Sequence, residues 1–478
     1  MLAEFRQNAF DSVGWSTLLL NNGDQAMIIR EMMERMEQRA PSSVMLRAML
    51  ENAFSAERLD RLFENTAQMQ ENKTLLFSTV ADIMGLVALK IHPSVHAAYQ
   101  ARQEEIGVTV KAVYDKLQRT EPGVSRMIVR DSGSRLREIV EQLQAGRELL
   151  PGYRVKIVDG NHLRRTERRL SELRVLNAAP LPGHCLVVLD PQSKLVIDVF
   201  PCEDAHAQER TLLPALLETV VPDDLLIMDR NLCTMDTLLG IKRRRAYFAI
   251  REHGGSLRSQ LVGKRTKIGR SDTGVVFEQP LQLLDPEGAV LATLRRVTVE
   301  LNEPTRDGEH EIHVLTNLPQ RVTALRVAEL YRKRWTIETA FQEIAANFAG
   351  EIETLGYPRA ALFAFCMALV SFNMLSVILH AMRARQGAKD DEVSIYYVCE
   401  EIAHTYRGLD LILDPSHWTA TYAELTPVQL AQALSRIAAR VVLSRYRKHK
   451  RGPKKPSPKM NKKRRNHIST ARVLGSSK

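Results

Sequence analysis

Apolar residues recur at helical spacing through the first quarter of the chain. They include Met27, Ile28, Met32, Met33 and Met36, and further along Met45, Leu46 and Leu50. Pro41, followed by two serines, is expected to break the first helix and to offer a cap for the next. The pattern predicts an all-helical N-terminal domain over residues 1–125. Core packing is the preferred interpretation of the methionine stripe, and an adaptable binding face is the alternative.

From Tyr153 the pattern changes to short β-rich runs. Strands are expected at 154–158, 184–189, 194–200, 224–228 and 246–250, with a hairpin turn at Pro191-Gln192 and helices at 211–220 and 234–242. Three strands, a helix, a strand, a helix and a strand in this order predict an α/β fold built on a mixed sheet.

Glycines and prolines then punctuate residues 253–320, where short strands are expected at 290–299 and 310–316. This segment is predicted to be a β-rich insertion. Helical spacing returns at 322–348, and residues 360–382 are apolar over a length that would cross a membrane. Because that stretch holds Ser371, Asn373, Ser376 and His380, a buried core helix is preferred over a membrane span. Residues 386–443 are expected to form a helical C-terminal region.

The charge balance favours a polyanionic partner, because Lys and Arg number 67 against 56 Asp and Glu, a formal net charge of +11. Residues 444–478 are predicted to be a basic tail, and its dense cationic run at 444–465 is of the kind that is usually solvated and disordered. The five cysteines form no C-x-x-C pair, which argues against a zinc knuckle or a disulfide framework. No apolar signal segment is visible at the N-terminus, so we expect a cytoplasmic protein without a membrane partner.

Two aspartates, Asp159 and Asp229, each follow a predicted strand. Carboxylates at the carboxyl ends of strands face the usual crevice of open α/β sheets, and oxygen ligands suit hard cations such as Mg²⁺. Two such ions can stabilise both the attacking and the leaving oxygen of a phosphoryl transfer. Aspartate at a strand end is also a common turn former or helix cap, so this pair alone leaves both interpretations open.

A third candidate group stands in the run LYRKRWTIETAFQEI, where Tyr331, Arg334 and Glu338 recur at helical spacing. At 100° per residue they lie along one side of a helix, and Arg334 can pair with Glu338. The alternative is a surface salt bridge beside a core aromatic residue.

This run resembles the Y-x2-R-x3-E signature of IS4 family transposases, and Trp335 and Ile337 also match it. The segments VDGNHLRRTERRL around Asp159 and IMDRNLCT around Asp229 resemble the first and second aspartate regions of that family. HISTARVL near the C-terminus resembles the family's usual ending. The resemblance covers residues 150–478, in family order.

The resemblance implies an RNase H-like catalytic core, formed by residues 150–252 and 321–385 and interrupted by the β-rich insertion. It implies that Asp159, Asp229 and Glu338 are catalytic metal ligands for Mg²⁺ or Mn²⁺, with two ions, and that Tyr331 and Arg334 contact DNA near the scissile phosphate. The implied enzyme is a DDE transposase of an insertion sequence. It hydrolyses the transposon ends and transfers their 3′-hydroxyl groups to target DNA.

The resemblance also implies the partners and the setting. These are terminal inverted repeats and target DNA, a homodimer in a synaptic complex, and a nucleoid-associated location in a bacterial cytoplasm. The N-terminal helices would help to bind the DNA ends. Cationic residues near the three acids are further candidate DNA contacts, unless they are simply solvated: Arg164, Arg165, Arg230, Lys242, Arg243, Lys264 and Arg265.

Two departures from the family pattern keep other functions open. Ala345 stands where the signature often has Lys, and the insertion lacks the Trp on which hairpin-forming relatives stack a flipped base. Phe277 is the candidate replacement for that Trp. A non-catalytic DNA-binding regulator and a general RNase H-like nuclease are the alternatives. Retention of all three acids argues against the first, and the large insertion argues against the second.

Overall fold

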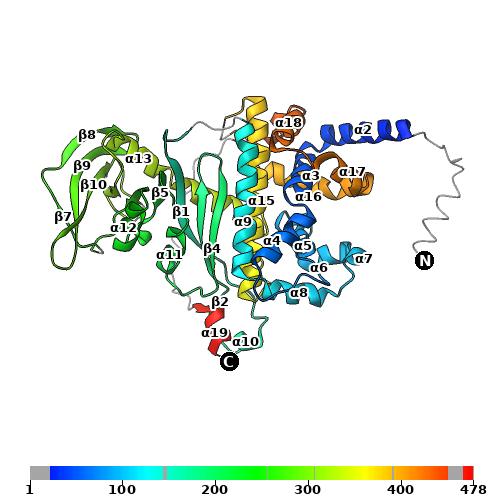
Figure 1. Cartoon of the computed structure of the whole chain (residues 1–478), viewed down its shortest axis with the longest axis horizontal. Coiled ribbons are helices and arrows are strands. Elements are labelled where there is room, and N and C mark those ends of the chain that lie inside the picture. The colour runs from blue at the N-terminus through cyan, green and yellow to red at the C-terminus, as the bar shows by residue number, and fades with distance from the viewer. Residues whose placement is uncertain are drawn as a thin grey trace, which may run out of the picture.

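The computed structural model describes residues 22–143, 148–255, 257–305, 307–389, 392–449 and 467–476. A twisted sheet and its covering helices form one half of the molecule, and a cluster of helices forms the other (Figure 1). The long helices α9 (Pro122–Gln142) and α15 (Pro358–Gln386) run side by side between the halves.

In the N-terminal part of the helical cluster, one helix ends and the next begins around Pro41, as predicted. Its helices are α2 (Asn22–Arg39), α3 (Pro41–Ala53), α4 (Ala56–Thr66), α5 (Phe77–Ala88), α6 (Val95–Ala101), α7 (Gln103–Ile106), α8 (Val110–Arg119) and α9. The predicted serine cap is wrong, because Pro41 itself occupies the first turn of α3 and the residue before the helix is Ala40. The expected boundary at residue 125 falls inside α9, and residues 1–21 lie outside the described part of the chain.

The methionine stripe divides into two parts. Met36 and Met45 are buried in the core, as predicted, whereas Met27 and Ile28 on α2 are exposed. Core packing is therefore the correct interpretation from Met36 onward and the wrong one at the start of α2.

The sheet contains the predicted strands in a single layer, together with β7, β8 and β9, for which no range was predicted. They are β1 (Arg154–His162), β3 (His184–Asp190), β4 (Leu195–Cys202), β5 (Asp224–Met228), β6 (Tyr247–Arg251), β7 (Ser259–Leu261), β8 (Thr266–Ser271), β9 (Gly274–Leu284), β10 (Val290–Leu301) and β11 (Glu311–Thr316). Their order is β4-β3-β1-β5-β6-β11-β10-β9-β7, with β8 paired to β9. Three antiparallel strands followed by the parallel pairs β1–β5 and β5–β6 match the expected RNase H-like core.

The β-rich segment 253–320 prolongs this sheet instead of forming a separate one. Strand β11 pairs antiparallel with β6, and β10 and β9 follow outward. The insertion is therefore joined to the core by backbone hydrogen bonds between strands.

Helices cover both faces of the sheet. Helices α9 and α15 pack on β4, while α11 (Leu213–Leu217), preceded by the short turn η1 (Glu209–Leu212), and α12 (Met235–Arg243) cover the other face. Thr234 caps α12 through its side chain.

Helix α15 is the one described helix long and apolar enough to cross a membrane, and its apolar window is entirely buried inside the protein. The prediction of a core helix is confirmed. The Asn373 amide accepts a hydrogen bond from the Val196 N–H at 2.7 Å and donates to the Val196 carbonyl at 2.8 Å. The polar residue that argued against a membrane span thus fastens the helix to β4.

The predicted single helix over 322–348 is two helices, α13 (Ala324–Arg332) and α14 (Trp335–Asn347), separated by a turn at Lys333 and Arg334. Thr323 caps the start of α13. Three consecutive cations, from Arg332 to Arg334, stand where the carbonyl end of α13 favours positive charge.

The C-terminal region also departs from expectation. After α16 (Ile395–Ile412), α17 (Pro415–Tyr422), α18 (Pro427–Ala438) and the turn η3 (Leu443–Tyr446), residues 450–466 of the predicted tail lie outside the described residues. Residues 467–476 are folded. Strand β12 (His467–Ser469) pairs parallel with β2 (Ala179–Leu181), and α19 (Thr470–Ser476) contacts α10 (Ser171–Arg174).

Buried polar groups hold this C-terminal segment. Ser469 and Thr470 are fully buried, the Ser469 hydroxyl accepts from the Ala205 N–H at 3.1 Å, and Arg472 pairs with Asp204 at 2.7 Å. The predicted basic tail, residues 444–478, therefore includes folded residues at 467–476.

Candidate active site

The register of the sheet brings the two aspartates to the same level. Strands β1 and β5 are parallel, and Val158 pairs with Met228, so Asp159 and Asp229 are the next residues on neighbouring strands. The prediction that β1 ends at Asp159 is wrong. The strand continues to His162, because it pairs antiparallel with β3 up to that residue. Strand β5 does end at Met228, and Asp229 begins the turn η2 (Arg230–Leu232).

Glu338 joins this edge of the sheet from the first turn of α14, which packs against β1. Arg334 links Glu338 to Asp159. Its Nη1 lies 3.0 Å from Asp159 Oδ2, and its Nη2 lies 2.7 Å from Glu338 Oε1. Arg334 is buried. The predicted Arg334–Glu338 pair is therefore present; its arginine is buried, its glutamate is partly exposed, and Arg334 also pairs with Asp159.

Tyr331 lies in the last turn of α13 beside this group, and its ring is buried. Burial raises the pKa of the Tyr331 hydroxyl, so the phenol stays protonated at neutral pH. Although the helix breaks between them, Tyr331, Arg334 and Glu338 remain neighbours, because Arg334 keeps helical backbone angles at the start of α14.

The electrostatic balance at Asp159 shows what kind of ligand the site favours. Burial raises the pKa of Asp159 from 3.8 to about 6, Arg334 opposes this, and the charges of Asp229 and Glu338 add to it. An N–H bond from Gly160 to Asp159 also favours the ionised form. One buried guanidinium thus stands against three carboxylates, and a further cation would relieve the excess negative charge.

The chemistry of these donors fits a divalent metal ion. Within the ranges that the structure describes, no three acidic, histidine or cysteine side chains are placed as a ready-made metal cage. Arg334 stands between Asp159 and Glu338 and supplies positive charge there. Carboxylate oxygens are the ligands that Mg²⁺ and Mn²⁺ prefer.

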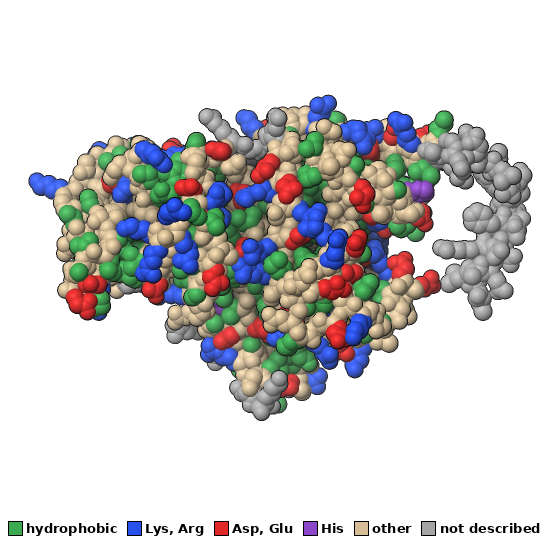
Figure 2. Space-filling model, in the orientation of Figure 1, with side chains coloured by type: hydrophobic (Ala, Val, Ile, Leu, Met, Phe, Trp, Pro, Cys, Tyr) green, Lys and Arg blue, Asp and Glu red, His purple; other side chains and the backbone are tan. Residues whose placement is uncertain are grey.

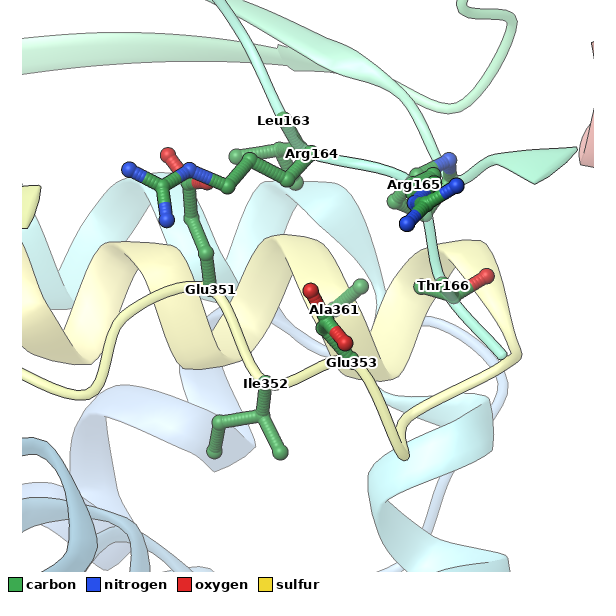
Figure 3. A pocket seen from close by; sticks show the side chains of 9 residues that line it. Leu163, Arg164, Arg165, Thr166, Glu351, Ile352, Glu353 and Ala361 are labelled. Carbon is green, nitrogen blue, oxygen red and sulfur yellow. The ribbon is translucent and has the colours of Figure 1, made fainter. Parts of the chain in front are cut away.

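Among the seven cationic residues predicted to contact DNA around the three acids, Arg164, Arg230 and Arg265 have acidic partners. Arg164 lies 3.0 Å from Glu351, beside a cavity of about 10 Å³ that has room for about one water molecule. Figure 3 shows Arg164 turned toward Glu351, with Arg165 apart from that pair.

The other two lie near the insertion. Arg230 lies 3.2 Å from Glu309. Arg265 pairs with two glutamates and covers the Phe277 ring at 4.0 Å from its centroid, so one face of Phe277 is already in use.

The other four of these cationic residues are exposed. Lys242 and Arg243 end α12, Lys264 lies in the turn before β8, and Arg165 follows β1. Ala345 is also exposed. It provides no cation at the position of α14 where the family signature often has a lysine.

The sequence prediction missed one acidic residue near the site. Glu209 begins η1, and its carboxylate lies over Gly160, next to Asp159. No spacing rule connects Glu209 to the three acids. The sequence signal that could have indicated it is Gly160, directly after Asp159, because a side chain there would collide with the Glu209 carboxylate.

Comparison with known proteins assigns the region that carries these residues. Residues 150–374 match the family described as the transposase DDE domain, and this range includes Asp159, Asp229 and Glu338. No curated protein sequence matches the chain.

One solved structure, a piggyBac transposase synaptic complex with hairpin DNA determined by cryo-EM, is similar at 11% identity and a TM-score of 0.38. The likeness covers 82% of this chain and 85% of that one. A TM-score this low carries no weight in the assignment, which rests on the family match. That match confirms the transposase class, while the IS4 family stays a prediction. The chain therefore carries a transposase DDE domain, over residues 150–374.

Proposed function

We propose that this chain cuts DNA at the ends of an insertion sequence and joins the freed 3′-hydroxyl groups to target DNA. Domains of the matched family use divalent metal ions. We propose Mg²⁺ or Mn²⁺, with two ions held by Asp159, Asp229 and Glu338. The observation that supports this most directly is the meeting of β1, the end of β5 and the first turn of α14 around Arg334.

Each residue has a distinct part in this proposal. Bound divalent ions would polarise the scissile phosphate and stabilise the attacking and leaving oxygens. Arg334 orients the carboxylates of Asp159 and Glu338, and its guanidinium is also suited to a phosphate. Tyr331, protonated and buried in the last turn of α13, holds the Arg334 guanidinium in place through a side-chain hydrogen bond.

DNA is the proposed partner of the surface around these residues. Lys and Arg side chains are spread over the middle of the face shown in Figure 2, with acidic side chains between them. The exposed residues Arg165, Lys242, Arg243 and Lys264 can contact phosphates, which positions a duplex without reading its sequence. Arg164, Arg230 and Arg265 would have to exchange acidic partners for phosphate.

The assembly and its setting are also proposals. Two ends must be held together for joining, so we propose a DNA-dependent homodimer in a bacterial cytoplasm, associated with the nucleoid. We assign DNA-end binding to the N-terminal helices. Because α9 and α15 share their core with β4, these helices would move with the catalytic sheet and not independently of it.

The test is cleavage of a duplex that carries the terminal inverted repeats flanking the coding gene. Cutting should require Mg²⁺ or Mn²⁺ and stop with EDTA. Asp159→Asn and Asp229→Asn should each abolish cutting and still bind the duplex, since binding rests largely on cations and phosphates. Asp236→Asn, an exposed aspartate on α12, is the matched control and should cut normally.

The outcomes separate the three candidate functions. A regulator would bind the repeats and never cut, and a general nuclease would cut duplexes with and without repeats equally. Normal cutting by Asp159→Asn or Asp229→Asn would remove that residue from the site.

A further inference from the structure

Glu209 lies where β1 and the turn after β5 meet. It follows β4 at the first position of η1, and its carboxylate lies directly over Gly160. A Cβ atom at position 160 would overlap both the Oε1 and the Cδ atoms of Glu209. The missing side chain of Gly160 therefore makes the space that this carboxylate occupies, one residue from Asp159.

The position of Glu209 is fixed from a second side. The neighbouring Arg210 donates from Nε to the carbonyl of Asn231 at 2.7 Å, and η1 packs against η2. Because η2 begins at the residue after Asp229, this bond ties Glu209 to the turn that carries the second aspartate.

The carboxylate of Glu209 is short of positive charge. Its side chain is 19% exposed, and its nearest cationic candidate in the described chain is His162, whose Nδ1 lies 3.9 Å from Oε1. Burial raises the pKa of Glu209, His162 opposes this, and the charge of Asp229 adds to it. Asp159, by comparison, has Arg334 at 3.0 Å. A buried carboxylate without a close donor or cation is costly unless a ligand neutralises it.

We propose that Glu209 is a fourth carboxylate of the metal site, and that it helps to hold a divalent ion on the side of Asp229. This inference rests on the proposed function, since it adds a ligand to the same site. It explains the glycine after Asp159, the tie between η1 and η2, and the incomplete neutralisation of Glu209. The three acids approach from β1, β5 and α14, and Glu209 approaches from the turn that precedes α11.

The test measures metal binding by the full chain, separately from cleavage. Mn²⁺ and Mg²⁺ are titrated by calorimetry into wild type, Glu209→Gln and Glu218→Gln, and melting in EDTA confirms that each variant is folded. Glu218 is exposed at the end of α11 and serves as the control. Glu209→Gln should bind the ions about 10-fold more weakly or worse, the size of loss typical of a missing group around a metal. Glu218→Gln should match wild type.

A second variant gives an independent route to the same result. Gly160→Ala displaces the Glu209 carboxylate without changing it, so it should also weaken binding in the wild-type chain. In a Glu209→Ala background the same change has nothing to displace and should add no further loss. The Mg²⁺ concentration for half-maximal cleavage should rise in both single variants, with the rate recovered at high Mg²⁺.

The results distinguish the two proposals. If Glu209→Gln binds both ions as tightly as Glu218→Gln, while Asp229→Asn loses binding, Glu209 is not part of the site and the proposed function stands. If Asp159→Asn and Asp229→Asn also bind as wild type does, the proposed metal site itself is wrong.

Discussion

Asp159→Asn should destroy cleavage and at the same time stabilise the metal-free protein. The pKa of this carboxyl is 3.8 without the fold and about 6 within it, and its side chain is 19% exposed. A difference of this size corresponds to about 3 kcal/mol of folding free energy. Protonation removes the attraction to Arg334 as well as the cost of burial, so an uncharged residue of the same shape should gain a similar amount.

The gain should depend on pH in a definite direction. The folded chain holds the proton of Asp159 more tightly than the unfolded chain does, so the free energy of unfolding falls as pH rises from 3.8 to about 6. Above about pH 7 the decline is nearly complete, and Asp159→Asn should exceed wild type by about 3 kcal/mol. At pH 5 wild type is largely protonated in the folded state, and the advantage should shrink to about half.

The assay is urea unfolding of both proteins in EDTA at pH 7.5 and pH 5, followed by the same measurement with Mg²⁺ at pH 7.5. Metal should stabilise wild type by mass action and leave the variant nearly unchanged. If Asp159→Asn is less stable than wild type in EDTA at pH 7.5, or if its advantage is the same at both pH values, the charge balance inferred for this site is wrong.

Three further outcomes follow from the same structure. Glu338→Gln should eliminate single-turnover cleavage and keep a normal melt, whereas Glu343→Gln, on the same helix beside cations outside the site, should cut nearly normally; the reverse pattern would overturn the assignment. Replacing the Lys and Arg residues of 450–466 by neutral residues should lower the slope of log K against log salt by about 0.9 for each phosphate that the chain no longer binds, and an unchanged slope would make the segment irrelevant to binding. Asn373→Leu should cost roughly 2–6 kcal/mol in urea unfolding, because it leaves the N–H and carbonyl of Val196 without partners, and a neutral result would contradict that bond pair.

Local pattern was enough to predict most elements of the catalytic sheet. Strand β5 lies where its short apolar run predicts it, and helix α12 begins and ends within one residue of the predicted range, 234–242. Strand β1 is longer than its apolar run, because pairing with β3 carries polar residues on to His162. Pairing between distant strands also decides that the insertion continues the main sheet, and no short-range pattern contains that information.

In the candidate site too, local motifs predict some features, and contacts between distant segments decide the others. The three acids could be named from their motifs, and the pairing of Val158 with Met228 explains why two of them meet. The burial of Arg334 and its bond to Asp159 depend on how α14 packs on β1, which helical spacing does not specify. Glu209 belongs to no motif and is brought to the site by the course of the chain after β4.

The pairing of β12 with β2 gives the order of synthesis a role in producing this enzyme. Ala205 and Ser469 are 264 residues apart in the chain, so the second is translated long after the first. Domains generally fold in order from the N-terminus during synthesis. Here, however, β2 must wait for its partner until residues 467–469 have been translated. A chain stopped before residue 467 would keep an open strand edge at β2, where other chains can pair. Aggregation and proteolysis would then remove chains that stop before β12.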